Sequence, residues 1–322
     1  MASFRMSLLG LGLCATLLYS ATAFSEDSLQ EEVVNAATSL ASKNASVESV
    51  VSYGLNRTAS KASQAITERL KKHIPTVEVD MSVTSEGKPT FGALILNPII
   101  ESEENDKLLF LQGSIFRRDS RTTGNIGLGA RKLTKNDTVL LGANAFYDYE
   151  FPYNHQRMSI GAEIRSTVGE LNANYYQALS GWNAGRGSLD ERVLDGYDVE
   201  VGVPLPYMPT TKAYVQRFRW DSQSGTKLEH GFTYAIESEI FNGVTVEVGH
   251  KNYNNSDDEN IASVRINLVE AFSKERKKPF IAKKAYSLES MKEARYDKVR
   301  RENLIRKEFR NTNPLVMNIT GF

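Results

Sequence analysis

The stretch Arg157-Met-Ser-Ile-Gly-Ala-Glu-Ile-Arg-Ser166 decides the fold, because apolar and polar residues alternate along it almost one by one. The apolar side chains share one face, and they belong to Met158, Ile160, Ala162 and Ile164. The opposite face carries charges and a hydroxyl, from Arg157, Ser159, Glu163 and Arg165. Successive side chains of a strand point to opposite faces of its sheet, so this pattern predicts a half-buried β-strand.

The same two-residue period returns from residue 74 to residue 270. It predicts about twelve strands between turn signals, and these are 74–83, 89–99, 107–117, 121–132, 137–150, 155–166, 169–180, 194–206, 211–221, 225–240, 243–253 and 260–270. Turn sequences such as Asn242-Gly243 separate the strands, and no segment between them is long and periodic enough for a crossover helix. We therefore expect sequential antiparallel pairing.

Such strands can form a soluble double sheet or a closed barrel in a membrane. The polar faces favour the barrel because they carry charges and glycines, whereas a sandwich core needs a second apolar layer. Aromatic residues near strand ends also resemble the girdles at the two interfaces of an outer-membrane barrel. They are Phe146, Tyr147, Tyr149, Phe151, Tyr153, Tyr175, Tyr176, Tyr207, Phe218 and Trp220. The predicted fold is all-β: a 12-stranded antiparallel transmembrane β-barrel in the lipid bilayer of the bacterial outer membrane.

The segments before the barrel at 74–270 have a different composition. Residues 1–23 have a basic start, an apolar stretch and the small-residue end Ala21-Thr-Ala23, which together predict a secretory signal peptide. Residues 24–73 carry apolar residues at loose helical spacing, so we expect a short helical periplasmic segment there. Beyond residue 25, no run of ~18 uncharged apolar residues occurs, which argues against helical membrane spans.

Residues 271–322 form a basic tail. From Ser273 onward they include 14 Lys and Arg against 6 Asp and Glu, although the whole chain has 39 of each. The equal totals argue against a nucleic-acid partner. A linker that threads a pore with an acidic lining explains the local charge better than a tail that binds nucleic acid or anionic lipid. Spacing within Glu289–Arg310 predicts a helix in this linker.

Six motifs occur in order along the chain. They are Leu141-Gly-Ala-Asn-Ala-Phe-Tyr-Asp-Tyr149, His155-Gln-Arg, Ile160-Gly-Ala-Glu163, Leu179-Ser-Gly-Trp182, Asp195-Gly-Tyr-Asp198 and Val248-Gly-His-Lys251. Together they resemble the translocator domain of the intimin/invasin family, the inverse autotransporters. The resemblance implies a barrel whose chain returns outward through the pore and displays a C-terminal passenger. It also implies barrel-assembly machinery and periplasmic chaperones as partners, and it leaves the host or cell-surface ligand open.

The resemblance also assigns roles to charged residues and to the tail. Inward-facing charges would line the pore and guide the threaded linker, and these are Asp148, Glu163, Arg165, Asp198, Glu200 and Arg265. The sequence stops at Phe322, about 50 residues past the last predicted strand. Fully extended, such a tail reaches on the order of 165 Å, enough to cross a membrane. We therefore expect a truncated or short passenger without an Ig-like domain.

The sequence predicts no metal, no cofactor and no enzymatic activity. Its four histidines are scattered, without a spacing such as His-Glu-x-x-His, and they are His73, His155, His230 and His250. The glycines of Gly124–Gly129 lie within a strand pattern, so we expect close packing rather than a phosphate cradle. Export of the tail is the leading hypothesis. A diffusion pore or structural barrel is the first alternative, and a hydrolase built on Asp148, His155 and Asp198 is the second.

Overall fold

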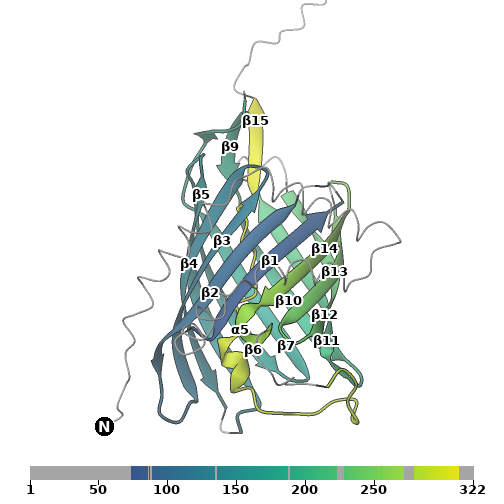
Figure 1. The fold of residues 1–322 in the computed structure, drawn as a ribbon. Coiled ribbons are helices and arrows are strands. Elements are labelled where there is room, and N and C mark those ends of the chain that lie inside the picture. The colour runs from purple at the N-terminus through teal and green to yellow at the C-terminus, as the bar shows by residue number, and fades with distance from the viewer. Residues whose placement is uncertain are drawn as a thin grey trace, which may run out of the picture.

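The computed structural model describes residues 74–311, apart from 86, 88, 135, 188, 223–227, 255 and 272–278. The predicted signal peptide and N-terminal helical segment lie outside the described residues. Within the described part, twelve strands close into an antiparallel barrel, which Figure 1 shows from the side. Among these residues, no helix combines the length and the apolar composition that crossing a membrane requires.

Each barrel strand pairs with its neighbour in the chain, except that β7 pairs with β10 and β1 pairs with β14 to close the barrel. The strands are β1 (Thr76–Thr84), β2 (Thr90–Glu101), β3 (Lys107–Arg118), β4 (Arg121–Leu133), β5 (Leu140–Phe151), β6 (His155–Ser166), β7 (Gly169–Ala178), β10 (Asp195–Leu205), β11 (Met208–Asp221), β12 (Leu228–Phe241), β13 (Val244–Tyr253) and β14 (Glu259–Asn267). The predicted fold class is confirmed. Both ends of the barrel sheet lie at the same rim, which is the periplasmic rim in barrels of this type.

Several predicted strand boundaries differ from the structure by two or three residues, and two of the differences have clear local reasons. Strand β2 continues to Glu101, beyond the predicted end at residue 99, because a register shift between Pro98 and Ile100 accommodates the proline. Strand β14 ends at Asn267 instead of residue 270, and the short helix α5 (Leu268–Ala271) follows it. The side chain of Asn267 accepts hydrogen bonds from the backbone N–H groups of Val269 and Glu270, at 3.1 and 3.4 Å, and so caps this helix.

The apolar face of the strands is the outer face of the barrel. Ile160 on β6, Val201 on β10 and Val248 on β13 are 58%, 48% and 55% exposed. Their polar neighbours along the strands point into the barrel instead, as the buried Ser159 and Glu200 show. An apolar outer face around a polar interior is stable only when lipid covers the outside of the barrel.

The lumen is also aromatic, which corrects the girdle prediction for part of the aromatic set. Some of these rings face outward and are exposed, as those of Tyr147, Tyr175 and Tyr207 are, at 39%, 52% and 52%. Others are buried in the interior, and these are Phe146, Tyr176, Phe218 and Trp220. Neighbouring residues of a strand point to opposite faces, so adjacent aromatic residues such as Tyr175 and Tyr176 separate between lipid and lumen.

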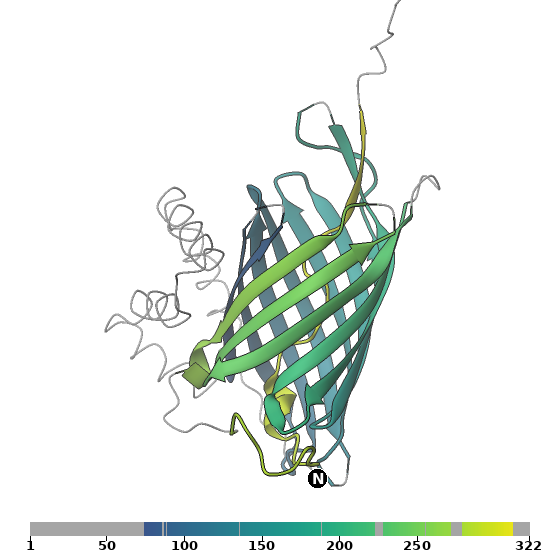
Figure 2. The ribbon, with the colours of Figure 1, turned by 90° about the vertical axis from the view of Figure 1, so that its right-hand side faces the viewer.

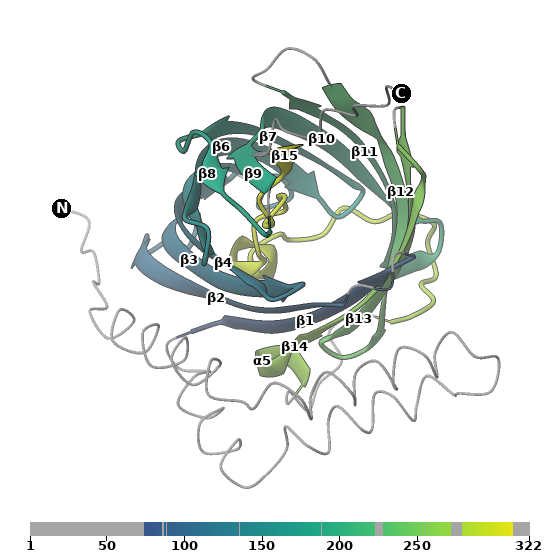
Figure 3. The ribbon, with the colours of Figure 1, turned by 90° about the horizontal axis from the view of Figure 1, so that it is seen from above.

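After α5 the chain returns through the barrel, as the view from above shows (Figure 3). It contains the short 3₁₀ helix η1 (Glu293–Tyr296), crosses the lumen without regular structure, and ends in β15 (Lys307–Asn311) at the opposite rim. The helix predicted over Glu289–Arg310 is therefore wrong beyond one turn. Side chains of the wall replace helical hydrogen bonding: Gln112 accepts from the N–H of Val299, at 2.9 Å, and Thr76 donates to the carbonyl of Tyr296, at 2.5 Å.

Candidate functional site in the barrel lumen and at its outer rim

The most deeply buried charge pair joins the wall to the returning chain. Asp148 on β5 is completely buried and receives two hydrogen bonds from the guanidinium of Arg301, at 2.8 and 2.7 Å. Arg157 on β6 donates to the same carboxylate, at 2.8 Å, and Asn125 on β4 donates at 2.7 Å. A buried carboxylate costs folding free energy unless its oxygens are satisfied, and here both oxygens accept from cations.

A second charge cluster lies on the other side of the lumen. Arg300 of the returning chain donates to Glu200 on β10, at 2.5 Å, and to Glu237 on β12, at 2.9 Å. Arg265 on β14 also pairs with Glu237, so this carboxylate receives a cation from both the wall and the linker. The guanidinium of Arg300 stacks on the ring of Tyr214, 3.9 Å from its centroid. Arg300 and Arg301 therefore bind opposite sides of the barrel.

A third cluster fixes the chain near the periplasmic rim. Arg131 on β4 pairs with Glu163 on β6, at 2.5 Å, and donates to the backbone carbonyls of Arg295 and Asp297, at 2.7 and 2.5 Å. The carboxylate of Asp297 accepts from Arg165 on β6, at 2.7 Å. The wall thus contacts the backbone of the returning chain as well as its charges.

The six residues predicted to line the pore lie on β5, β6, β10 and β14 with their side chains largely buried. Asp148, Arg165 and Glu200 contact the returning chain directly. The remaining three reach it through one intermediate side chain: Glu163 through Arg131, Asp198 through Tyr176, and Arg265 through Glu237. Sequence reasoning missed the partners on the linker, although the surplus of arginine and lysine in the tail was their signal.

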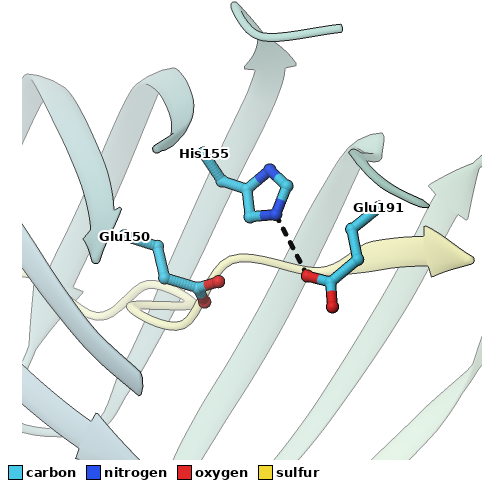
Figure 4. Close-up of side chains that lie close together, drawn as sticks. All are labelled: Glu150, His155 and Glu191. Carbon is cyan, nitrogen blue, oxygen red and sulfur yellow. Dashed lines mark hydrogen bonds and ion pairs between the residues drawn. The ribbon is translucent and has the colours of Figure 1, made fainter. Parts of the chain in front are cut away.

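A further cluster occupies the outer rim, where Figure 4 shows Glu150 of β5, His155 of β6 and Glu191 converging. Glu191 belongs to β9 (Leu189–Val193), a strand of the loop between β7 and β10. The carboxylate of Glu191 accepts a hydrogen bond from Nε2 of His155, at 3.1 Å, when the imidazole carries a proton on Nε2. Arg121 bridges Glu150 and Glu191, and Lys307 of the returning chain binds Glu150 at 2.6 Å.

The donor atoms of Glu150, His155 and Glu191 lie within 4.8 Å of one another, which is a spacing that can suit a metal ion. Their carboxylate oxygens, however, already accept from Arg121 and Lys307. A cation would have to displace these partners. The other imidazole nitrogen, Nδ1 of His155, is buried and makes no hydrogen bond with a described residue, so no hydroxyl nucleophile is placed against it. The structure does not bring Asp148 or Asp198 to this histidine; its partner is Glu191.

Above the rim, the returning chain ends in a small sheet with order β15-β9-β8, where β8 spans Asn183–Ala184. Figure 1 shows β15 and β9 side by side above the barrel. Two guanidiniums lie over the indole ring of Trp182, those of Arg192 on β9 and Arg310 on β15, at 4.6 and 4.2 Å from its centroid. Burial would raise the pKa of Glu191, but its hydrogen bonds and ion pair with Arg121 lower this pKa to about 2.

Comparison with known proteins identifies the architecture. Residues 23–303 match the family described as inverse autotransporter, beta-domain. A putative attaching and effacing protein homolog of Escherichia coli (strain K12) is 36% identical over 152 residues, which are 46% of this chain and 50% of that protein. An intimin of Citrobacter freundii is 25% identical over 258 residues, which are 77% of this chain and 27% of that protein. The chain thus spans half the length of the first relative and less of the second.

A solved structure gives the same result for the fold. It comes from a study of the mechanism behind the in-meso crystallization of membrane proteins, and it has a TM-score of 0.59 and 22% sequence identity. The alignment covers 73% of this chain and 100% of that one. Because the family match extends over most of the sequence, the chain belongs to the inverse autotransporters and is a β-barrel of the bacterial outer membrane.

Proposed function

We propose that the barrel exports the C-terminal part of its own chain through the lumen and holds it at the cell surface. The returning chain supports this proposal, because residues 297–306 run through the barrel in contact with its inner wall and β15 pairs with β9 at the outer rim (Figure 2). No catalytic group is required for such a function. The barrel wall supplies a polar passage. Folding of the exported segment outside the barrel makes its movement outward favourable.

The charge clusters explain how the exported chain stays in place. Three arginines of the linker pair with carboxylates of the wall: Arg295 with Glu101, Arg300 with Glu200, and Arg301 with Asp148. Withdrawal toward the periplasm would remove the cation that faces Glu200 and one of the two cations that face the buried Asp148, which is unfavourable. In this proposal the six wall residues predicted from the sequence guide and then retain the linker. Assembly of such a barrel would depend on barrel-assembly machinery and periplasmic chaperones.

The test is the topology of the chain in living cells. An epitope is fused after Phe322, and intact cells are treated with protease. We expect the epitope to be removed without lysis. The matched control carries the same epitope at Asn105, in the turn between β2 and β3 at the periplasmic rim, and should be protected. Protection of the epitope after Phe322 in cells that contain the folded barrel would contradict export.

A diffusion pore is the second candidate, and one observation favours it. A cavity of about 650 Å³ opens beside the linker toward the outer rim, lined by both acidic and basic side chains such as Glu229, Asp258 and Arg118. Water and small ions would fit this space. A continuous path for solutes requires the linker to leave the lumen, so conductance separates the two candidates.

A further inference from the structure

Before it enters the barrel, the returning chain crosses the periplasmic rim as a segment without helix or strand, residues 279–290, which we call the periplasmic strap. Figures 1 and 2 show it below the barrel strands, at the end opposite β15. The strap binds the turn between β10 and β11 through two backbone hydrogen bonds, from Ala282 N–H to the carbonyl of Tyr207 and from Tyr207 N–H to the carbonyl of Ala285, at 2.8 and 3.1 Å. The barrel therefore fixes the position of the strap.

The strap is held at two further turns along the same rim. Thr167, between β6 and β7, donates to the carbonyl of Ser287 at 2.6 Å and accepts from the N–H of Glu289 at 3.1 Å. Directly after the strap, Met291 N–H donates to the carbonyl of Asp137, between β4 and β5, at 2.6 Å. The main chain and small side chains make these contacts, so the large side chains of the strap are left outside them.

Those large side chains are apolar and exposed. Ile281, Tyr286 and Leu288 are 72%, 52% and 60% exposed, and Phe280 is 38% exposed. Two exposed lysines, Lys283 and Lys284, lie among them. Apolar and aromatic side chains on both sides of a lysine pair, on a backbone that is hydrogen-bonded to the rim, match a membrane interface, where apolar groups enter the acyl boundary and the ammonium groups remain among phosphates.

The strap is continuous with the surface of the barrel that lipid already covers. Tyr207, to which it is hydrogen-bonded, is itself 52% exposed, and the preceding strand β10 presents Val203 outward at 46%. We propose that the periplasmic strap is a membrane-binding surface that inserts its apolar side chains into the phospholipid headgroup region of the periplasmic leaflet. Lys283 and Lys284 would bind the phosphates of anionic phospholipids there.

The same rim offers a matched control. The turn between β2 and β3 carries the exposed acidic residues Glu103 and Glu104 and no large apolar side chain between Ser102 and Asp106. A label at this turn reports a periplasmic position in water. The only cysteine of the chain is Cys14, within the predicted signal peptide, so single-cysteine variants of the barrel need no background substitution.

The experiment measures contact between the strap and lipid. Ile281→Cys, Leu288→Cys and the control Glu103→Cys are labelled with an environment-sensitive fluorophore in vesicles of phosphatidylethanolamine and phosphatidylglycerol. We expect a lipid that carries its quencher near the headgroup to quench the labels at 281 and 288 several-fold more strongly than the label at 103. Equal quenching at all positions would overturn the proposal. Labels at 281 and 288 that leave the aqueous environment only when periplasmic protein is added would also overturn it, because a protein and not lipid would then cover the strap.

A second arm tests the lysines without altering the labelled positions. In the Ile281→Cys background, Lys283→Gln with Lys284→Gln should reduce lipid quenching in vesicles that contain phosphatidylglycerol. The same pair of substitutions should have little effect in vesicles of phosphatidylcholine alone. An identical decrease in both kinds of vesicle would overturn the assignment of these lysines to anionic phospholipids.

Discussion

At the scale of single residues, the buried carboxylate of Asp148 is the most sensitive position in the lumen. Its side chain and those of Arg157 and Arg301 are all 0% exposed. Asp148→Asn preserves the shape but leaves two guanidiniums without their counter-charge. We expect the free energy of unfolding to fall by about 3–5 kcal/mol, as measured by urea titration of the barrel in detergent.

Two comparisons test the cause of that loss. Glu103→Gln neutralises an exposed carboxylate and should change the free energy of unfolding by no more than about 0.5 kcal/mol. Combining Asp148→Asn with Arg301→Met should recover part of the loss, because one of the two unpaired cations is removed. Simple additivity of the two substitutions would argue against direct coupling.

The glycines of β4 give a second prediction at this scale. A Cβ atom at Gly129 would lie 2.1 Å from the ring of Phe110, which is completely buried, whereas at Gly124 the nearest atom is 4.0 Å away. Gly129→Ala should therefore lower the free energy of unfolding by about 1–3 kcal/mol through overpacking. Gly124→Ala in the same strand is the control and should cost clearly less. Equal losses in urea titrations would show that the Phe110 ring moves freely.

At the scale of elements, the strands were predictable, but the conformation and contacts of the returning chain were not. Alternation along β6 and β10 is a local property, since each apolar residue simply faces lipid. The linker is held by partners more than a hundred residues away, such as Asp148 for Arg301, so its local pattern carries no such information. The spacing of residues in the linker resembled that of a helix, but in the lumen the charged side chains of the linker point toward different sides of the barrel wall.

The contacts at the outer rim also join residues whose pairing the local sequence does not reveal. His155 was visible in the sequence, but its partner Glu191 lies in a loop strand whose position depends on pairing with β15. Nothing in the spacing of these two residues predicts their contact. The six wall charges were selected by their place on the polar face of a strand, and the same reasoning could not say which of them touch the linker.

The sheet of β15 and β9 is the element whose stability should depend on pH. The pKa of Glu191 is about 2 in the folded protein and near 4.5 when the residue is unpaired, so its charge stabilises the sheet above about pH 4.5. This contribution should be lost as the pH falls from about 4.5 toward 2. The expected result is weaker hydrogen-exchange protection of the backbone amides of residues 307–311 in acid, after correction for intrinsic exchange rates.

The substitution Glu191→Gln separates this carboxylate from the other acids of the rim. The amide keeps the shape but loses the ion pair with Arg121. Protection of residues 307–311 should be lower than in the parent at neutral pH, and it should decrease less between pH 4.5 and 2. An unchanged acid response in the variant would assign the pH dependence to other groups, such as Asp190, which pairs with Arg310.

At the scale of the whole molecule, the number of strands decides how much material the lumen must hold. Side chains alone fill a barrel of about eight strands, while barrels of about sixteen enclose an aqueous channel. The twelve strands of this barrel fall between these cases. Here the lumen contains aromatic side chains, charge clusters and one polypeptide segment, with Val299 packed against Leu96 and Phe110 of the wall. The linker is therefore part of the interior of the barrel as well as its cargo.

Removing the linker should accordingly open the barrel. A chain that ends after Ser290 retains all barrel strands but lacks the segment that crosses the lumen. In planar lipid bilayers we expect the full chain to be nearly closed and the shortened chain to conduct roughly tenfold more or higher. Arg300→Gln with Arg301→Gln, which weakens the attachment to both walls, should give brief openings between these limits. Equal conductance of the full and shortened chains would mean that the linker leaves the lumen in the membrane, and would favour the diffusion pore over export and retention.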